Sequence, residues 1–132
     1  MILKSISQIH SFPTTAADIY TILTDERRHS SFTGDLVHIT DSEDEPFTLS
    51  DGLVSGKNVV LERGKKIIWS FQYHKPGWPE GHFSEAAIIL SDTAKNECQL
   101  ELFHTAIPEQ FTGELEQFWK QNWEALTYYL ER

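Results

Sequence analysis

The sequence predicts an α+β fold in which a curved antiparallel sheet of about six or seven strands wraps around one long C-terminal helix. Two observations lead to this architecture. Residues 111 to 131 place apolar side chains every three or four positions, the spacing of an amphipathic helix. Most of the chain before them reads as short strands separated by turns. A helix of this length extends about 31 Å, so it should lie across a broad sheet.

One face of the C-terminal helix is apolar, within an arc of roughly 140°. We expect Leu115, Phe118, Trp119 and Leu126 to be buried against the sheet. Asn122 lies inside the same arc, and a buried amide needs hydrogen-bond partners. Nearby backbone, water or a ligand could each provide them.

Length and composition describe one soluble domain spanning residues 1–132, with 39% hydrophobic and 23% charged residues. The net charge of −9 argues against nucleic acid or an anionic membrane as a partner. A single cysteine, Cys98, excludes an intramolecular disulfide and fits a reducing compartment. The first residues lack the apolar run of a signal peptide, so we expect a cytoplasmic protein.

In the first part of the chain, residues 2–11 alternate as a strand that Pro13 ends. Thr14 or Thr15 should then cap a short helix, and a polar run over 24–31 predicts a second short helical turn and a loop. Alternation over residues 36–40 predicts another strand.

The second part predicts a hairpin turn at Asp51-Gly52, followed by strands over 53–62, 66–74, 83–91 and 97–106. Trp69, Phe71 and Tyr73 share one face of their strand, which must therefore be covered. A sheet curved around a helix leaves a cavity between the two wherever core side chains do not fill the space.

Several short motifs occur in a defined order along the chain. They are Phe12-Pro13, Leu23-Thr24-Asp25, Phe32-Thr33-Gly34, Asp51-Gly52 with Gly56, the strand ending at Trp69, the run from Trp78 to Ser84, the strand Leu100 to His104, Ile107-Pro108, and Trp123 with Leu126 and Leu130. This ordered set resembles the START-like (SRPBCC) superfamily, whose helix-grip fold is START/Bet v 1-like. Within it, the chain looks like the activator of heat-shock protein 90 ATPase homologue-like family.

The chain departs from that family pattern at two positions. Phe32 stands where tryptophan is usual, and Asn122 stands where glycine commonly precedes the helix tryptophan. Both changes would alter the lining of an internal cavity. The resemblance implies a role in contacting a chaperone, and some START-like relatives are cyclases or hydrolases.

The six histidines form no metal-binding motif, and we predict neither a metal nor a cofactor. His29, His38, His74 and His82 are interpreted as surface or loop residues. His104 continues the inward row of Cys98, Leu100 and Leu102. It is either a hydrogen-bonded core residue or a polar group on a pocket wall. The same row predicts a buried, inert thiol at Cys98.

The sequence therefore favours a non-catalytic domain that binds a hydrophobic or aromatic small molecule between sheet and helix. The residues predicted to line the cavity are Phe32, Trp69, Phe71, Tyr73, Trp78, His104, Trp119 and Asn122. One alternative is a chaperone-associated interaction domain. The other is a cyclase-like or hydrolase-like enzyme, for which His104, His10 and Asp35 are the available acid–base groups. We expect a monomer or a weak homodimer.

Overall fold

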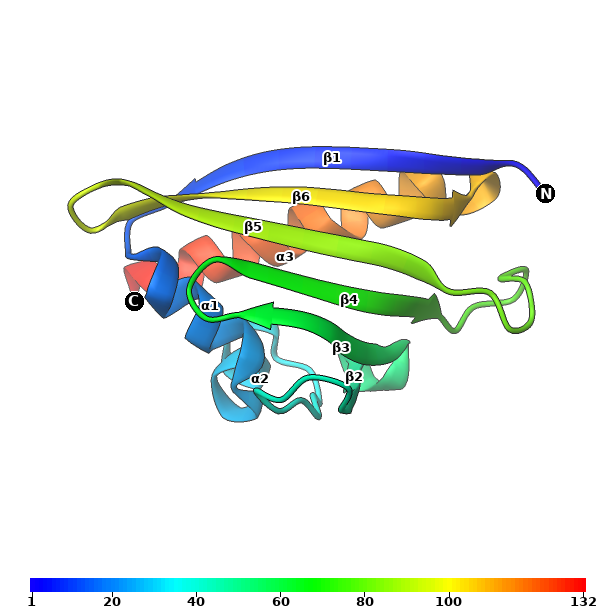
Figure 1. Cartoon of the computed structure of the whole chain (residues 1–132), viewed down its shortest axis with the longest axis horizontal. Helices are drawn as coiled ribbons and strands as arrows, with labels where there is room; N and C mark the ends of the chain where they lie inside the picture. The colour runs from blue at the N-terminus through cyan, green and yellow to red at the C-terminus, as the bar shows by residue number, and fades with distance from the viewer.

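A computed structural model describes residues 1–132. It confirms the predicted fold: one six-stranded antiparallel sheet carries the long helix α3 across one face (Figure 1). The strand order is β1-β6-β5-β4-β3-β2. The elements are β1 (Leu3–Phe12), α1 (Ala16–Thr24), α2 (Glu26–Thr33), β2 (Pro46–Leu49), the 3-10 turn η1 (Ser50–Gly52), β3 (Val54–Glu62), β4 (Lys66–Tyr73), β5 (Ser84–Ala94), β6 (Glu97–Pro108), the 3-10 turn η2 (Glu109–Phe111) and α3 (Thr112–Glu131).

The core is one cluster of 29 buried residues, which come from the sheet, the three helices, η2 and the segment before β2. Leu115, Trp119 and Leu126 are buried as predicted, together with Trp123. Phe118 is only half-buried, because it lies at the border of the apolar arc, where its ring meets Phe71 edge-on. The sequence therefore predicted the correct apolar face of α3, but Phe118 is less buried than expected.

Two short helices follow β1, and side-chain caps define where they begin. The Thr15 hydroxyl accepts a hydrogen bond from the Asp18 amide, which caps the start of α1. Asp25 ends α1 and caps α2 by accepting from the amide of Arg28 at 2.9 Å. Both helices pack at one end of the sheet, beside the C-terminal end of α3 (Figure 1). None of the helices is long and apolar enough to span a membrane.

The strand predicted over residues 36–40 is wrong. Val37 and Ile39 are buried, so the alternation is real, but the segment makes only one isolated bridge, between His38 and Thr48. A side chain accepts one of the backbone hydrogen bonds that a partner strand would otherwise accept. The amide of Leu36 donates to a carboxylate oxygen of Asp51 at 2.7 Å. The neighbouring β2 is only four residues long, so a full partner strand has little to pair with.

Candidate functional site

A chain of hydrogen bonds runs through the interior from α3 to β4. Trp119 donates its indole N–H to Nδ1 of His104 at 2.9 Å, which leaves the ring proton on Nε2. Nε2 lies 2.7 Å from the Ser84 hydroxyl, and that hydroxyl donates to the carbonyl of Phe71 at 3.2 Å. The protein therefore supplies partners for both ring nitrogens of His104.

Aromatic rings close the space around His104. Its ring centroid lies 4.5 Å from that of Phe71 and 5.9 Å from that of Trp119, both in edge-on geometry. Burial lowers the pKa of His104 to about 3, so the imidazole is neutral. No buried polar side-chain atom in the chain lacks a partner. This part of the interior is a packed core.

The residues predicted to line one cavity lie in separate places. Trp69, Phe71, Trp119 and His104 are fully buried in the core, whereas Trp78 is half-buried against Tyr73 and Phe111. Phe32 is also buried, and its ring stacks on His29 at 4.8 Å. Asn122 lines one hollow beside α3, and Tyr73 and Trp78 line a different one, so the structure does not bring these residues together with His104.

The hollow that Asn122 lines, which we call the α3 hollow, has a volume of about 460 Å³ and lies between the end of α2, η1 and α3. Its apolar wall comes from Leu53, Phe118 and Ala125, and its polar wall includes Asn122 and the carboxylates of Asp35 and Asp51. Partial burial raises the pKa of Asp35, and the neighbouring Asp51 carboxylate raises it further.

The three acid–base groups considered for an enzyme do not meet. His104 is in the core, and Asp35 lines the α3 hollow. His10 lies on β1, where its Nε2 is 3.0 Å from the Thr127 hydroxyl, and it lines a different hollow. The structure therefore does not assemble these three groups into one site.

Among the remaining histidines, His29 corrects the sequence interpretation. It is buried in α2 rather than exposed, and its Nδ1 lies 2.9 Å from the carbonyl of Leu23. Burial lowers its pKa to about 4. No group of three or more His, Cys, Asp or Glu side chains is arranged to hold a metal ion. Cys98 is buried, as predicted, and burial raises the pKa of its thiol to about 11.

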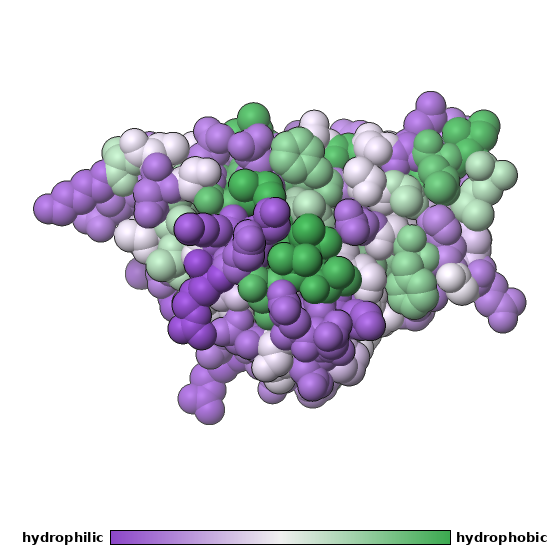
Figure 2. Space-filling model, in the orientation of Figure 1, coloured by the Kyte–Doolittle hydropathy of each residue, from purple (hydrophilic) through white to green (hydrophobic).

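The face of the sheet turned away from α3 is covered by no other element (Figure 1). We call it the outer face. The pairing register places Val60, Ile68, Ala87 and Phe103 side by side across β3, β4, β5 and β6. Ile9 on β1 and Ile89 on β5 both lie opposite Glu101 and extend this set. These six residues form the outer apolar row, and hydrophobic side chains gather near the centre of this face in Figure 2.

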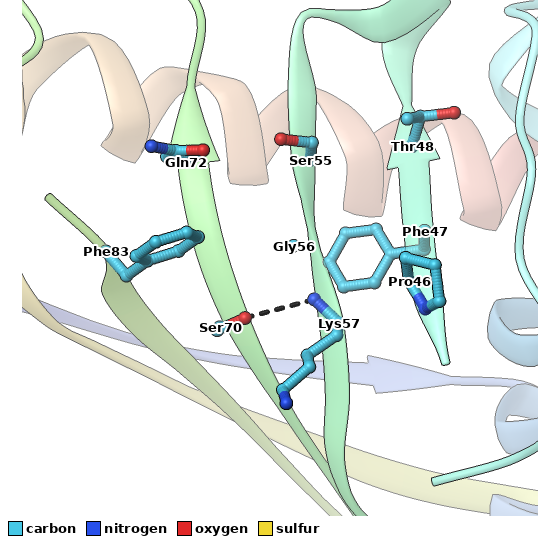
Figure 3. A pocket seen from close by; sticks show the side chains of 9 residues that line it. All are labelled: Pro46, Phe47, Thr48, Ser55, Gly56, Lys57, Ser70, Gln72 and Phe83. Carbon is cyan, nitrogen blue, oxygen red and sulfur yellow. Dashed lines mark hydrogen bonds between the residues drawn. The ribbon is translucent and has the colours of Figure 1, made fainter. Parts of the chain in front are cut away.

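A second hollow, of about 620 Å³, opens on the outer face beside this row (Figure 3). We call it the Gly56 hollow. Phe83 stands on one side of it and Pro46 and Phe47 on the other, with Gly56 between them. Its polar groups come from Thr48, Ser55, Lys57, Ser70 and Gln72.

A local break in the β3–β4 ladder shapes this hollow. The amide of Lys57 donates to the Ser70 hydroxyl at 3.0 Å, and neither Gly56 nor Lys57 has a partner in the β3–β4 register. A Cβ on Gly56 would lie 1.8 Å from the Ser70 carbonyl oxygen, so only glycine fits there. Lys57 takes part in none of the six ion pairs in the structure. The hollow therefore combines two aromatic side chains with an unpaired cation.

Sequence reasoning did not identify the outer face. The strand periodicity placed Ile68 and Phe103 opposite the inward rows, but a single apolar residue on a strand's solvent side is ordinary. Only the register across four strands shows that these residues are neighbours. The one available signal was Gly56 inside a strand pattern, which indicates a bulge or a close backbone approach.

Residues 13–131 match the model of the family described as "Activator of Hsp90 ATPase homolog 1-like protein". The chain is 25% identical over 119 residues to the Activator of 90 kDa heat shock protein ATPase homolog of Dictyostelium discoideum. That match covers 90% of this chain but 30% of the relative, so the chain spans about a third of the relative's length.

Two solved structures share the fold at low sequence identity. An HSP90 activator from Plasmodium falciparum superposes with a TM-score of 0.81 at 18% identity, covering 90% of this chain and 89% of its own. The Aha1 dimer from Colwellia psychrerythraea, determined in solution, gives a TM-score of 0.80 at 17% identity, covering 97% and 96%.

Proposed function

Because the chain belongs to the Activator of Hsp90 ATPase homolog 1-like family, we propose that it is a non-catalytic domain that binds an Hsp90-type chaperone through its outer sheet face. The observation that carries this proposal is the contrast between the two faces of the sheet. The inner face is packed against α3 around His104, whereas the outer face carries the outer apolar row, in which Ile9 and Phe103 are exposed.

The outer face has features of a protein-binding surface. Phe103 is 42% exposed, and Phe83, at the Gly56 hollow, is 53% exposed. Aromatic side chains next to a hollow are frequent anchors in interfaces, because they bury a large area at small entropic cost. The unpaired Lys57 favours a partner segment that carries an acidic residue beside its apolar ones.

The proposal is tested by measuring binding of the chain to a purified Hsp90-type chaperone by biolayer interferometry. Phe83→Glu and Phe103→Glu each place a charge on the proposed contact, and we expect each to weaken binding about tenfold or more. Tyr128→Glu is the matched control, because Tyr128 is exposed on α3 away from the outer face. Equal effects of all three variants, or no binding by the unmodified chain, would refute the proposal.

A second function retains support at the α3 hollow, where Asn122 and Phe118 meet the carboxylates of Asp35 and Asp51. We propose as the alternative that a small molecule with an apolar body binds there. The ligand would present hydrogen-bond donors, or an amine, to the amide and the acids. Of the eight residues predicted from the sequence to line a cavity, Asn122 lines this site. Its aromatic wall is Phe118 and not the tryptophans that are buried in the core.

Native mass spectrometry of the purified chain against a library of aromatic amines and their neutral analogues tests this alternative. Asp35→Asn should reduce retention of the amines about tenfold and leave the neutral analogues unaffected. His104→Leu should change neither, because His104 is sealed in the core. A ligand whose retention depends on His104 but not on Asp35 would contradict this placement.

A further inference from the structure

The two edges of the sheet differ in how they are protected. β2, at one edge, has four residues, begins with Pro46, and is partly covered by the bridge between His38 and Thr48. β1, at the other edge, has ten residues and no strand beyond it (Figure 1). Short strands, prolines and covering segments keep edges from pairing with other chains, so only the β2 edge carries these devices.

The free edge of β1 is long, regular and nearly uncharged. Apart from its ladder with β6, the strand's backbone makes no further backbone hydrogen bond. Lys4 is its only lysine, arginine or acidic residue, and Glu109 pairs with it at 3.6 Å. The register shift in the β1–β6 pair inserts an extra residue on β6, between His104 and Ile107, which leaves β1 itself unbroken. An edge of this kind is a template for strand addition.

The residues of β1 are complementary to a second copy of themselves. In an antiparallel pairing centred on Ile6, residues whose numbers add up to twelve lie opposite one another. Leu3 then faces Ile9 of the second copy on the outer face, and two-fold symmetry repeats this pair. Leu3 is 45% exposed and Ile9 is 67% exposed in the single chain, so the pairing covers both.

The neighbouring symmetric registers lose this match. Shifting the centre to residue 5 or 7 places Leu3 opposite Ser7 or Ser11 of the second copy. The register centred on Ile6 also places Ser5 opposite Ser7, two small side chains that cause no clash. α3 does not block the approach, because it lies against the inner face of β1, where Trp123 donates to Gln8 at 3.1 Å.

We propose that two copies of this chain associate through their β1 edges, antiparallel and centred on Ile6, to form one continuous sheet. Ile9, which belongs to the outer apolar row and to the pairing edge, then joins the row of each copy to Leu3 of the other copy. An edge-only contact is small, so we expect a weak dimer in the micromolar range. This inference stands on β1 alone and does not depend on the proposed chaperone contact.

Charge exchange at Ser5 and Ser7 tests whether the β1 edge forms the contact. Both side chains are exposed, so substitutions there leave the core untouched. The Ser5→Lys/Ser7→Lys variant and the Ser5→Asp/Ser7→Asp variant each place like charges opposite one another. Each should be monomeric at concentrations where the unmodified chain dimerises in sedimentation velocity runs. Mixing the two should restore a dimer that contains one copy of each, detected by native mass spectrometry.

The control is Ser91→Lys/Thr93→Lys, which adds the same charge at exposed positions of β5 away from the edge. It should dimerise like the unmodified chain. The proposal is overturned if the unmodified chain stays monomeric at high micromolar concentration. It is equally overturned if the Ser5 and Ser7 variants dimerise as well as the control, or if mixing them yields no mixed dimer.

Discussion

The indole N–H of Trp119 on α3 donates to Nδ1 of His104 on β6 across 2.9 Å, inside the fully buried core. This bond joins α3 to the sheet inside the core, where each of the two polar groups needs a hydrogen-bond partner. Replacing His104 with leucine leaves the indole donor without an acceptor, so His104→Leu should lower the free energy of unfolding by about 1–3 kcal/mol.

Urea denaturation followed by tryptophan fluorescence measures this loss. His38→Leu is the control, because His38 is an exposed histidine and should change stability by less than about 0.5 kcal/mol. Unchanged or higher stability in His104→Leu would mean that the hydrogen-bond chain contributes nothing to the fold.

The free energy of unfolding should fall as the pH is lowered, because two histidines are buried in the neutral form. Burial lowers the pKa of His104 to about 3 and that of His29 to about 4, both below the ordinary value of 6.5. Protons therefore bind the unfolded chain first, and the stability present above pH 6.5 is lost as the pH falls toward these folded-state values. Each histidine should remove about 2 kcal/mol of unfolding free energy between pH 7 and pH 5.

Comparing the unmodified chain with His104→Leu isolates one histidine from the carboxylates that also titrate. The variant should lose less stability than the unmodified chain over the same interval, by the contribution of a single histidine. Parallel curves of unfolding free energy against pH for the two proteins would contradict the neutral, buried state of His104.

Gly56 should be irreplaceable even by alanine. The added Cβ would overlap the backbone carbonyl of Ser70, which cannot rotate away as a side chain could. Gly56→Ala should therefore cost about 3 kcal/mol or more in thermal or urea unfolding. Gly113→Ala, at the start of α3 where a Cβ meets nothing within 4 Å, should be neutral or stabilising. Similar effects of the two substitutions would refute the close approach of β3 to β4.

Leu126 anchors the second half of α3 to the sheet and is fully buried. Leu126→Ala should lower the unfolding free energy by about 2–5 kcal/mol, through lost burial and the cavity left behind. Tyr128→Ala, on the exposed side of the same helix, should cost less than about 0.5 kcal/mol. A small effect of Leu126→Ala in calorimetry would mean that another face of α3 meets the core.

Local patterns were enough to predict most of the fold. The three-and-four spacing over 111–131 identified α3, and alternation located β1 and the four strands from residue 53 to residue 108 within a few residues. These signals are reliable because each element must bury one face, and burial imposes its period on the sequence. The same alternation misled over residues 36–40, since it reports which side chains are buried and not whether the backbone has a partner strand.

Periodicity along the chain was enough to place His104 in the buried row beside Leu102 and the half-buried Asn122 within the apolar arc of α3. The contacts of these side chains follow instead from the packing of separate elements. Trp119 and Ser84 are 15 and 20 positions from His104 in the chain, and they satisfy its ring within the core. The outer apolar row and the Gly56 hollow arise from strand register, which brings together residues from separate strands. Contacts of this kind depend on how elements pack, and no local pattern of one chain encodes that packing directly.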